Sequence, residues 1–595
     1  MEKKEEGGHF PKESVFLSDK SGGYFALDGD SFTQYQGLIH FLPSEWELYK
    51  TIEDIRPKGI NAKSIVVMQD GFFEKHTGHV IERFWFSSTN LIYEIHGSKE
   101  VSLQLDFRKI HDYDDKGRIY NIYQEKDMLI IEYKKYDDLD LKNFSYSKFL
   151  VLKGVKSYEL VNKWIKKNYA YDELRNSKSE FYVYDALTFI LEDIRIVFGF
   201  GSTKKEAIDN ANKKVEINIH NLILDTEIAA VAMSNLIVNL HYKNKNIKGI
   251  IAGLPWFYQL WGRDEAISLI GLITAKEYAQ TKEIMMRLIE SLDDDGCLHN
   301  RWPESMLKSA DATGWLFKRI HQFFIVLERE NKLNKLFSSK ELNLIFDKIS
   351  RYAKYSLSLI HEDLIVNKPL ETWMDTMDKE GKDVRSGARI EIQALHLAIY
   401  ALGEDLVKLL KKENATFTIL KDALKEKTRN TFFVDGLICD GYENGVLDRT
   451  LRPNVFLAYY IYPQLFSKEE WELAFDKVID ACFLDWGGFS TIDKNNYLFR
   501  EEHTGMNNES YHRGDSWFFV NNISALCMLH LNSKKYHEYI KKIRKASVTE
   551  MIEMGFIGNC AEISSAKKLC SRGCLAQAWS VATLVELLHE YYKEK

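Results

Sequence analysis

The chain is poor in the features that mark secreted, disulfide-bonded and membrane-spanning proteins. Its 595 residues include only seven cysteines, which are widely scattered, so neither a disulfide framework nor a cysteine-based zinc site is expected. No run of about 18 uncharged apolar residues occurs, and the charged first residues, MEKKEEGGHFPKES, lack the apolar core of a signal peptide. We therefore predict a cytoplasmic protein with buried thiols and no membrane partner.

A basic excess is also absent. The 80 lysines and arginines are outnumbered by 87 aspartates and glutamates, which gives a formal net charge of -7. Binding to a phosphate backbone requires clustered positive charge, so we expect no nucleic-acid partner. With only eight prolines and 45% hydrophobic residues, the chain should fold into about two to four globular domains. Its composition does not indicate an oligomeric state.

Residues 1–202 carry the pattern of an antiparallel β-sandwich. Short runs rich in valine, isoleucine and aromatic residues alternate with Asp, Asn, Gly and Lys clusters, and no helical pattern lies between them. Such evenly spaced strands are typical of two packed sheets. The clearest runs are SIVVMQ, VIERFWF, NLIYEIHG, VSLQLDF, MLIIEYK and SKFLVLKG.

The pattern becomes helical after this region. We interpret residues 203–224 as a helical linker and residues 225–595 as a second domain. That domain contains about twelve segments with apolar residues at offsets of three and four, the first of them at 225–243. Twelve helices joined by alternating short and long loops fit a closed toroid of six helical hairpins, written (α/α)6. The sequence shows no repeat of fixed period, which argues against an open solenoid.

The stretch 250–275, IIAGLPWFYQLWGRDEAISLIGLITA, combines tryptophans with a charged pair at the start of an apolar helix. Arg263 offers a planar fork of donors and Asp264 offers acceptors. Together with Trp256 and Trp261 they suit a ligand with many hydroxyls and an apolar ring face, such as a sugar. The same pair could instead be a structural ion pair at a helix start. This stretch alone leaves both interpretations open.

Four later loops each place a carboxylate and a tryptophan ahead of an apolar helix. In a helical toroid, loops at one end meet at one place, and a glycosidase needs a carboxylic acid and a second carboxylate there. The alternative is that Asp311 and Asp515 are helix N-caps, that Glu562 caps or bridges, and that the tryptophans are core. The pairs are Asp311 with Trp315, Asp375 with Trp373, Asp515 with Trp517, and Glu562 with Trp579. Among them, we predict that Asp311 and Asp515 bind substrate.

Seven motifs within residues 225–595 resemble, in order and spacing, the glucosidase region of archaeal and bacterial glycogen-debranching enzymes. This is the amylo-alpha-1,6-glucosidase type, which is related to glucoamylases. The segments FLSDKSGGYFALDGD and VSLQLDFRKIHDYDD are similar to the N-terminal β-sandwich of the same enzymes. The seven motifs are LPWFYQLWGRDEAISL, SADATGWLF, ETWMDT, RSGARIEIQAL, LRPN, YHRGDSW and RGCLAQAWSVATLVELL.

The resemblance implies an inverting hydrolysis of an α-glucosidic bond in an (α/α)6 barrel. It makes Asp375 the general acid and Glu562 the general base, and it assigns Arg263 and Asp264 to the outer hydroxyls of the terminal glucose. Inverting enzymes hold their two carboxyl groups roughly 6.5 to 9.5 Å apart, so that a water fits between base and sugar. This chemistry uses no cofactor and no metal. The further sugar contacts that the resemblance implies are Trp261, Trp373, Glu391, His512 and Trp579.

The favoured function is therefore an exo-acting α-glucosidase that releases glucose from glycogen-like or malto-oligosaccharide substrates, with α-1,6 linkages preferred to α-1,4 linkages. The chain departs from residues that are common in the family at several positions. Because of these departures, a glucoamylase-like or trehalase-like hydrolase of short α-glucosides is an alternative, and so is a non-catalytic glucan-binding protein. The departures are Glu265, Gly314, Thr376, Ala561 and Ser564.

Overall fold

A computed structural model describes residues 14–27, 32–60, 64–69, 71–217, 224–243, 245–303 and 309–593. By contacts between Cα atoms the chain divides into two compact units. One contains residues 1–247 and 552–559, and the other contains residues 248–551 and 560–595. Within the described ranges, no helix is both long and apolar enough to cross a membrane.

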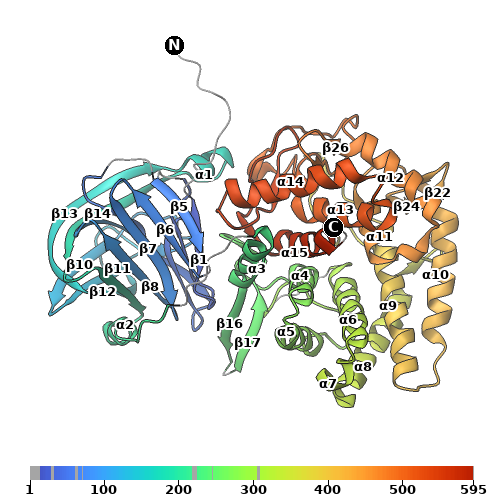
Figure 1. Ribbon diagram of the computed structural model, residues 1–595, viewed down its shortest axis with the longest axis horizontal. Coiled ribbons are helices and arrows are strands. Elements are labelled where there is room, and N and C mark those ends of the chain that lie inside the picture. Colours follow the sequence, from blue (N-terminus) through green and yellow to red (C-terminus); the bar gives the residue numbers. More distant parts are fainter. Residues whose placement is uncertain are drawn as a thin grey trace, which may run out of the picture. The chain divides into compact units, whose positions relative to one another are not determined.

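The first unit contains two antiparallel sheets, of seven and eight strands (Figure 1). In sheet order, the seven-stranded sheet is β1 (Val15–Ser18), β2 (Tyr24–Leu27), β3 (Gly37–Leu42), β4 (Glu47–Pro57), β9 (Glu100–Lys109), β14 (Glu180–Leu191) and β13 (Val155–Asn168). The eight-stranded sheet is β10 (Arg118–Glu125), β11 (Met128–Tyr136), β12 (Phe144–Lys153), β15 (Arg195–Gly201), β8 (Asn90–His96), β7 (Val80–Ser87), β6 (Phe72–Thr77) and β5 (Ser64–Gln69).

The two sheets share one hydrophobic core, which confirms the predicted sandwich. Alternate residues of facing strands point inward, and the core includes Leu103 and Leu105 of β9 together with Leu150 and Leu152 of β12. All six quoted runs are strands of these sheets. Helix α1 (Ala170–Leu174) precedes β14, and helix α2 (Lys204–Ala211) packs against β12 and β15.

The prediction of a helix at 225–243 is wrong for the second half of that segment. Helix α3 (Asp225–Asn235) ends early, and strands β16 (Ile237–Tyr242) and β17 (Lys245–Ile250) follow it. The sequence IVNLHY has branched apolar residues and period-two burial, which favours a strand over a helix. The linker boundaries at 203–224 stay a prediction, and residues 218–223 of that linker lie outside the described part of the chain.

The second unit is helical, and six of its helices form a closed ring. Each of the six packs against the next, and the last returns to the first. Most residues of these helices are buried, because each is enclosed both by its ring neighbours and by further helices. In ring order they are α4 (Gly262–Thr274), α6 (Ala312–Arg329), α9 (Ile390–Leu409), α11 (Asn454–Ile461), α13 (Phe518–Asn532) and α15 (Ala578–Lys593).

The remaining long helices alternate with the ring helices along the chain and lie outside the ring. They have one buried face only, as expected for an outer layer. This alternation of inner and outer helices is the predicted (α/α)6 arrangement, and the predicted fold class is confirmed (Figure 1). The outer helices are α5 (Tyr278–Glu290), α8 (Ser339–Ser356), α10 (Thr416–Phe432), α12 (Lys468–Cys482) and α14 (His537–Glu553), with the four-residue α7 (Leu333–Leu336) before α8.

Short strand pairs hold the loops that precede the ring helices. Strand β18 (Gly253–Leu254) pairs with β30 (Ala576–Gln577), and β28 (Ser516–Trp517) pairs with β29 (Ile563–Ser564). Strand β21 (Ala388–Arg389) pairs with β24 (Gly441–Glu443), which also pairs with β25 (Val446–Asp448). Three hairpins complete the unit: β19 (Ile360–His361) with β20 (Leu364–Ile365), β22 (Phe433–Val434) with β23 (Leu437–Ile438), and β26 (Phe483–Leu484) with β27 (Gly488–Phe489).

Candidate active site

Arg263 lies in the first turn of α4 and connects two loops, those before α6 and α9. Its Nε donates to Oδ1 of Asp311 at 2.8 Å, and its Nη1 donates to Oδ2 of Asp375 at 3.1 Å. Its Nη2 donates to the backbone oxygen of Glu371 at 3.3 Å. The guanidinium is almost entirely buried, so these charge-assisted bonds are shielded from water. Arg263 therefore orients the segment that carries Asp375.

Asp375 is the more accessible of the two predicted catalytic carboxylates. Its side chain is 40% exposed, and it precedes α9 in a loop without regular structure. Desolvation by the surrounding protein raises the pKa of Asp375, nearby Asp311 raises it further, and Arg263 opposes both effects. A carboxyl group that is accessible and keeps its proton to a higher pH than usual can act as an acid.

Asp264 lies next to Arg263 and is only 8% exposed. Burial raises the pKa of Asp264 to about 8, and the negative charges of Glu562 and Asp375 add to the increase. The same two carboxylates also raise the pKa of Tyr511. The predicted acid and the predicted base therefore both contribute to the electrostatic surroundings of Asp264 and Tyr511.

Glu562 is held from two sides. The Tyr511 hydroxyl donates to its Oε1, and the backbone N–H of Cys574 donates to its Oε2 at 3.0 Å. Gly573, with a φ of +66°, lies directly against the carboxylate, and a Cβ atom there would be 2.3 Å from Oε2. The side chain is 2% exposed. The two hydrogen bonds and the contact with Gly573 fix the position of the Glu562 carboxylate.

Hydrogen bonds connect the N-terminal ends of all six ring helices. Each ring helix or the loop before it contributes at least one member, so residues far apart in sequence meet at one rim of the ring. The bonds join Arg263 to Asp311 and Asp375, Trp373 to Asn454, Thr376 to His512, Tyr511 to Glu562, and Gln577 to Asp264.

Trp373, His512 and Trp579 belong to one aromatic cluster at this rim. The His512 ring stacks on Trp517 with centroids 5.1 Å apart, and Trp373 contacts both rings edge-on. Trp579 contacts Trp517 in the same way and stacks on Phe519. These rings are almost entirely buried, so the structure gives them a packing role, and their contact with a sugar stays a prediction.

Glu391 lies in a buried ion-pair network beneath the loop of Asp375. Both of its oxygens accept from Arg385, at 2.7 and 3.1 Å. Arg385 also binds Asp440 and the Thr372 hydroxyl. Because both carboxylate oxygens of Glu391 are occupied, it supports the loop, and a direct sugar contact by Glu391 stays a prediction.

The two aspartates that could have been helix caps do not act as caps. Asp311 stands at the N-cap position of α6, but its side chain accepts from Arg263 and from Ser309 rather than from the helix backbone. Asp515 precedes β28 and accepts from His503 Nδ1 and from the Ser510 hydroxyl, both at 2.7 Å. Both aspartates are fully buried. They stabilise the rim, and whether they touch substrate stays a prediction.

Trp256 and Trp261 precede α4 and are partly exposed. The Trp261 ring contacts Phe257 edge-on, and the Arg301 guanidinium lies 6.0 Å from its centroid. Residues 304–308, in the loop that leads to Asp311, lie outside the described ranges. Stacking of either indole on a sugar ring stays a prediction.

Three residues at the site were not predicted. Tyr511 and Gly573 lie within the quoted motifs YHRGDSW and RGCLAQAW, but nothing in their spacing connects them to Glu562. Arg385 lies in RSGARIEIQAL, six residues before its partner Glu391. Arginines at other positions of the same loop could equally have bound the glutamate, and the fold decides between them.

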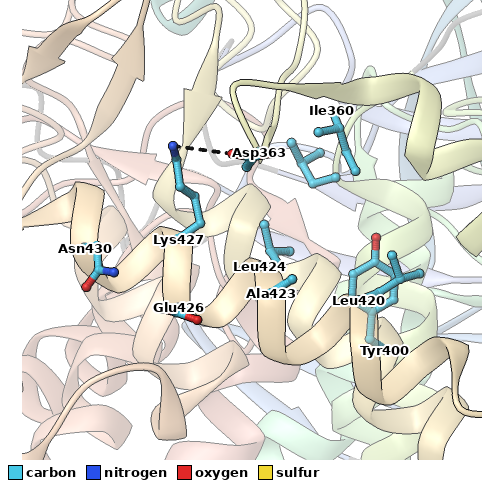
Figure 2. A pocket seen from close by; sticks show the side chains of 10 residues that line it. Ile360, Asp363, Tyr400, Leu420, Ala423, Leu424, Glu426, Lys427 and Asn430 are labelled. Carbon is cyan, nitrogen blue, oxygen red and sulfur yellow. Dashed lines mark ion pairs between the residues drawn. The ribbon is translucent and has the colours of Figure 1, made fainter.

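A further pocket is lined by none of these residues and lies between the β19–β20 hairpin and helix α10. Figure 2 shows its apolar wall, and Lys427 at its edge forms an ion pair with Asp363 at 3.8 Å. Its volume is about 360 Å³, and no predicted site residue lines it. It therefore takes no part in the candidate site.

Comparisons with known proteins bear on the family and the fold of this chain. The sequence profile of amylo-alpha-1,6-glucosidases matches residues 231–586. A comparison with curated protein sequences gives no match. The structure of a bacterial glucoamylase complexed with acarbose is similar to this chain with a TM-score of 0.63 at 11% identity, covering 99% of this chain and 95% of that chain. A mannosylglycerate hydrolase from Thermus thermophilus, in complex with Tris and D-glycerate, gives a TM-score of 0.47 at 11% identity, covering 62% and 100%.

Proposed function

Because this chain belongs to the amylo-alpha-1,6-glucosidase family and is a glycoside hydrolase, we propose that it is an inverting, exo-acting α-glucosidase. Its substrates are glycogen-like glucans or malto-oligosaccharides, and it releases glucose with a preference for α-1,6 branch linkages. The family and the glucoamylase-like fold support a carbohydrate substrate.

One observation carries the proposal: two carboxylates in different surroundings occur at the same rim. Asp375 is accessible, and its pKa is raised. Glu562 is buried, with a donor on each of its oxygens. Acid–base cleavage of a glycosidic bond needs one carboxyl group as proton donor and a second as proton acceptor, and these surroundings support that assignment.

The proposed reaction proceeds in one displacement. Asp375 donates its proton to the glycosidic oxygen as the bond from that oxygen to the anomeric carbon breaks. A water molecule attacks the anomeric carbon from the opposite face and loses a proton to Glu562. The products are a free alcohol on the shortened glucan and glucose with inverted anomeric configuration.

Arg263 and Asp264 are proposed to hold the outer hydroxyls of the terminal glucose. Asp264 has a pKa of about 8, so near neutral pH it is largely protonated and can donate a hydrogen bond as well as accept one. Trp256 and Trp261 supply partly exposed ring faces beside them. The role proposed for Arg263 is twofold, because it also holds Asp375.

The first experiment measures glucose release from limit dextrin, isomaltose-type, maltose-type and trehalose substrates. Asp375→Asn and Glu562→Gln should each reduce the rate about 100- to 10,000-fold, as expected for loss of a general acid or base. Asp363→Asn, at an 85% exposed position that pairs with Lys427 and with none of the rim residues, is the matched control and should keep the wild-type rate. Glucose released at an unchanged rate by either rim variant would remove that residue from the mechanism.

The second experiment determines the anomer that forms first. Proton NMR of the early product should show β-glucose from an α-glucoside, because a single displacement inverts the anomeric centre. Initial formation of α-glucose would contradict the inverting mechanism. Fastest turnover on trehalose would replace the proposed substrate by a short α-glucoside, and glucan binding without glucose release would indicate a binding protein.

A further inference from the structure

Two pairs of sequence neighbours face each other across the rim. Asp375 is followed by Thr376, and the Thr376 hydroxyl lies 2.8 Å from Nδ1 of His512. His512 is preceded by Tyr511, whose hydroxyl donates to Oε1 of Glu562. Two hydrogen bonds and two adjacent residues thus connect the segment of the predicted acid to the carboxylate of the predicted base.

The His512 ring has little freedom to move. It is 1% exposed, stacks on Trp517 at 5.1 Å with an interplanar angle of 13°, and contacts Trp373 edge-on. Within the described residues, Nδ1 has the Thr376 hydroxyl as its partner and Nε2 has none. Burial, reinforced by nearby arginines, lowers the pKa of His512 well below its usual value, so the ring is neutral when the enzyme works. The Thr376 bond and the stacking therefore set its orientation.

Tyr511 is fixed in a similar way. Its ring contacts Trp517 with centroids 4.7 Å apart, and its backbone oxygen accepts from Trp517 Nε1 at 2.8 Å. Burial and the charge of Glu562 raise the pKa of Tyr511 well above its usual value, so the hydroxyl keeps its proton and remains a donor. Tyr511 can therefore hold Glu562 over the whole pH range in which the enzyme is active.

Arg513, which follows His512, binds the backbone of the loop that carries Asp375. Arg513 is 2% exposed, and its Nη2 donates to the backbone oxygen of Thr376 at 2.8 Å. Its Nε donates to Oδ2 of Asp383 at 2.8 Å. The loop of the acid is therefore attached to the segment of Tyr511 through both the backbone and the side chain of Thr376.

We propose that the Tyr511–His512 pair is a rigid spacer that sets the distance between the predicted acid and the predicted base. The proposal rests on the proposed function, because it presumes that Asp375 and Glu562 are the catalytic pair. Tyr511, His512 and Thr376 are positioning residues in it. Each acts through another group, and the physical reason for their rigidity is the buried aromatic cluster against which both spacer rings pack.

The spacer matters because an inverting mechanism tolerates only a limited range of distances between the two catalytic carboxyl groups. The two carboxyl groups must leave room for one water, roughly 6.5 to 9.5 Å, and a displacement of about 1 Å costs roughly 100-fold in rate. Loosening either end of the spacer should therefore slow the chemical step more than it weakens substrate binding.

The experiment uses conservative variants at the two ends of the spacer. Tyr511→Phe removes the hydroxyl on Glu562 and should lower kcat roughly 10- to 100-fold, because that bond is to a charged group. It should also move the acidic limb of the kcat/KM profile to higher pH, since a carboxylate that loses a donor binds its proton more tightly. Thr376→Val removes the hydroxyl on His512 at nearly constant volume and should lower kcat about 3- to 10-fold.

Three further variants separate positioning from general damage. In Tyr511→Phe combined with Thr376→Val, kcat should fall less than the product of the two single effects, because both changes loosen one connection. Thr376→Ser keeps the hydroxyl and should restore the wild-type kcat. Tyr442→Phe removes a hydroxyl bound to Glu362 and should leave kcat and the pH profile unchanged. Thermal melting confirms that each variant is folded.

Three outcomes would overturn the spacer. They are a Thr376→Val enzyme with wild-type kcat, a double variant whose losses multiply, and a Tyr511→Phe enzyme in which KM alone changes. These outcomes leave the proposed function intact as long as wild-type enzyme releases glucose and Asp375→Asn does not. A wild-type enzyme that hydrolyses none of the tested glucosides would instead refute the proposed function.

Discussion

Gly573 allows a stringent test of the role of Glu562. The substitution Gly573→Ala places a Cβ atom 2.3 Å from Oε2 of Glu562 and 3.0 Å from its Cβ. The first distance is roughly 1 Å shorter than ordinary van der Waals contact. Glu562 sits between this position and Tyr511, so the carboxylate must move away from the Cys574 N–H that it accepts from.

The expected effects on stability and on catalysis differ in size. An alanine at a φ of +66° costs about 1 to 2 kcal/mol of folding free energy, because its Cβ crowds the backbone in the left-handed region. Displacing the base by about 1 Å should cost roughly 100-fold in rate, which corresponds to about 2.7 kcal/mol in activation free energy. Gly573→Ala should therefore be a folded protein with strongly reduced activity.

Gly436 provides the matched control. Its φ is +68°, and a Cβ there would meet only Leu473 and Lys477, both at 3.8 Å. Gly436→Ala carries the same backbone cost without the clash, so it should unfold at a similarly lowered urea concentration and keep wild-type glucose release. Equal activities of the Gly573→Ala and Gly436→Ala enzymes would show that moving Oε2 of Glu562 has no catalytic consequence, and the assignment of Glu562 as the base would then be refuted.

Four further predictions concern charge and stability. Arg263→Gln removes the cation that lowers the pKa of Asp375, so the alkaline limb of the kcat/KM profile should move to higher pH; an unmoved limb would exclude Asp375 as the acid. Glu391→Ala leaves the Arg385 guanidinium buried without one of its carboxylate partners. It should lower the free energy of unfolding, measured with urea, by about 3 to 5 kcal/mol. A loss below about 1 kcal/mol would contradict the supporting role of Glu391. Burial raises the pKa of Glu550 from 4.5 to about 8, so between these pH values the unfolded chain releases a proton that the folded chain keeps, and the free energy of unfolding falls as pH rises. Glu550→Gln should flatten this decline by up to about 1.4 kcal/mol per pH unit. An unchanged slope would refute the raised pKa. Exhaustive dialysis against EDTA should leave glucose release intact, and activity restored by Ca²⁺ would contradict a metal-free mechanism.

Much of the fold could be predicted from local patterns. The strand runs of the first unit and eleven of the twelve predicted helices follow the expected period, because one face of each element must be buried. The exception is 225–243, where IVNLHY satisfies both a helical and a strand pattern over a short distance. Such short apolar runs are decided by the neighbours against which they pack, and here the strand β16 forms.

The candidate site was predictable in its residue types but not in its geometry. The Arg263–Asp264 pair and the loops that carry Asp375 and Glu562 could be recognised from their composition and from the family resemblance. Their proposed roles as accessible acid and buried base depend on exposure and on hydrogen-bond partners such as Tyr511 and Arg263, which are more than fifty residues away in sequence. Spacing along the chain contains no information about such partners.

The sequence by itself therefore determined the class of the protein: a β-sandwich joined to a helical ring with carboxylates and aromatic residues at its loops. Periodicity and composition report which residues are buried, and burial drives folding. Only the tertiary structure decided that Glu391 supports a loop through Arg385, that Asp311 pairs with Arg263 rather than capping α6, and that Tyr511 holds Glu562. Hydrogen bonds and charges act over a few ångströms, so their partners exist only once the ring has closed and brought its six loops together.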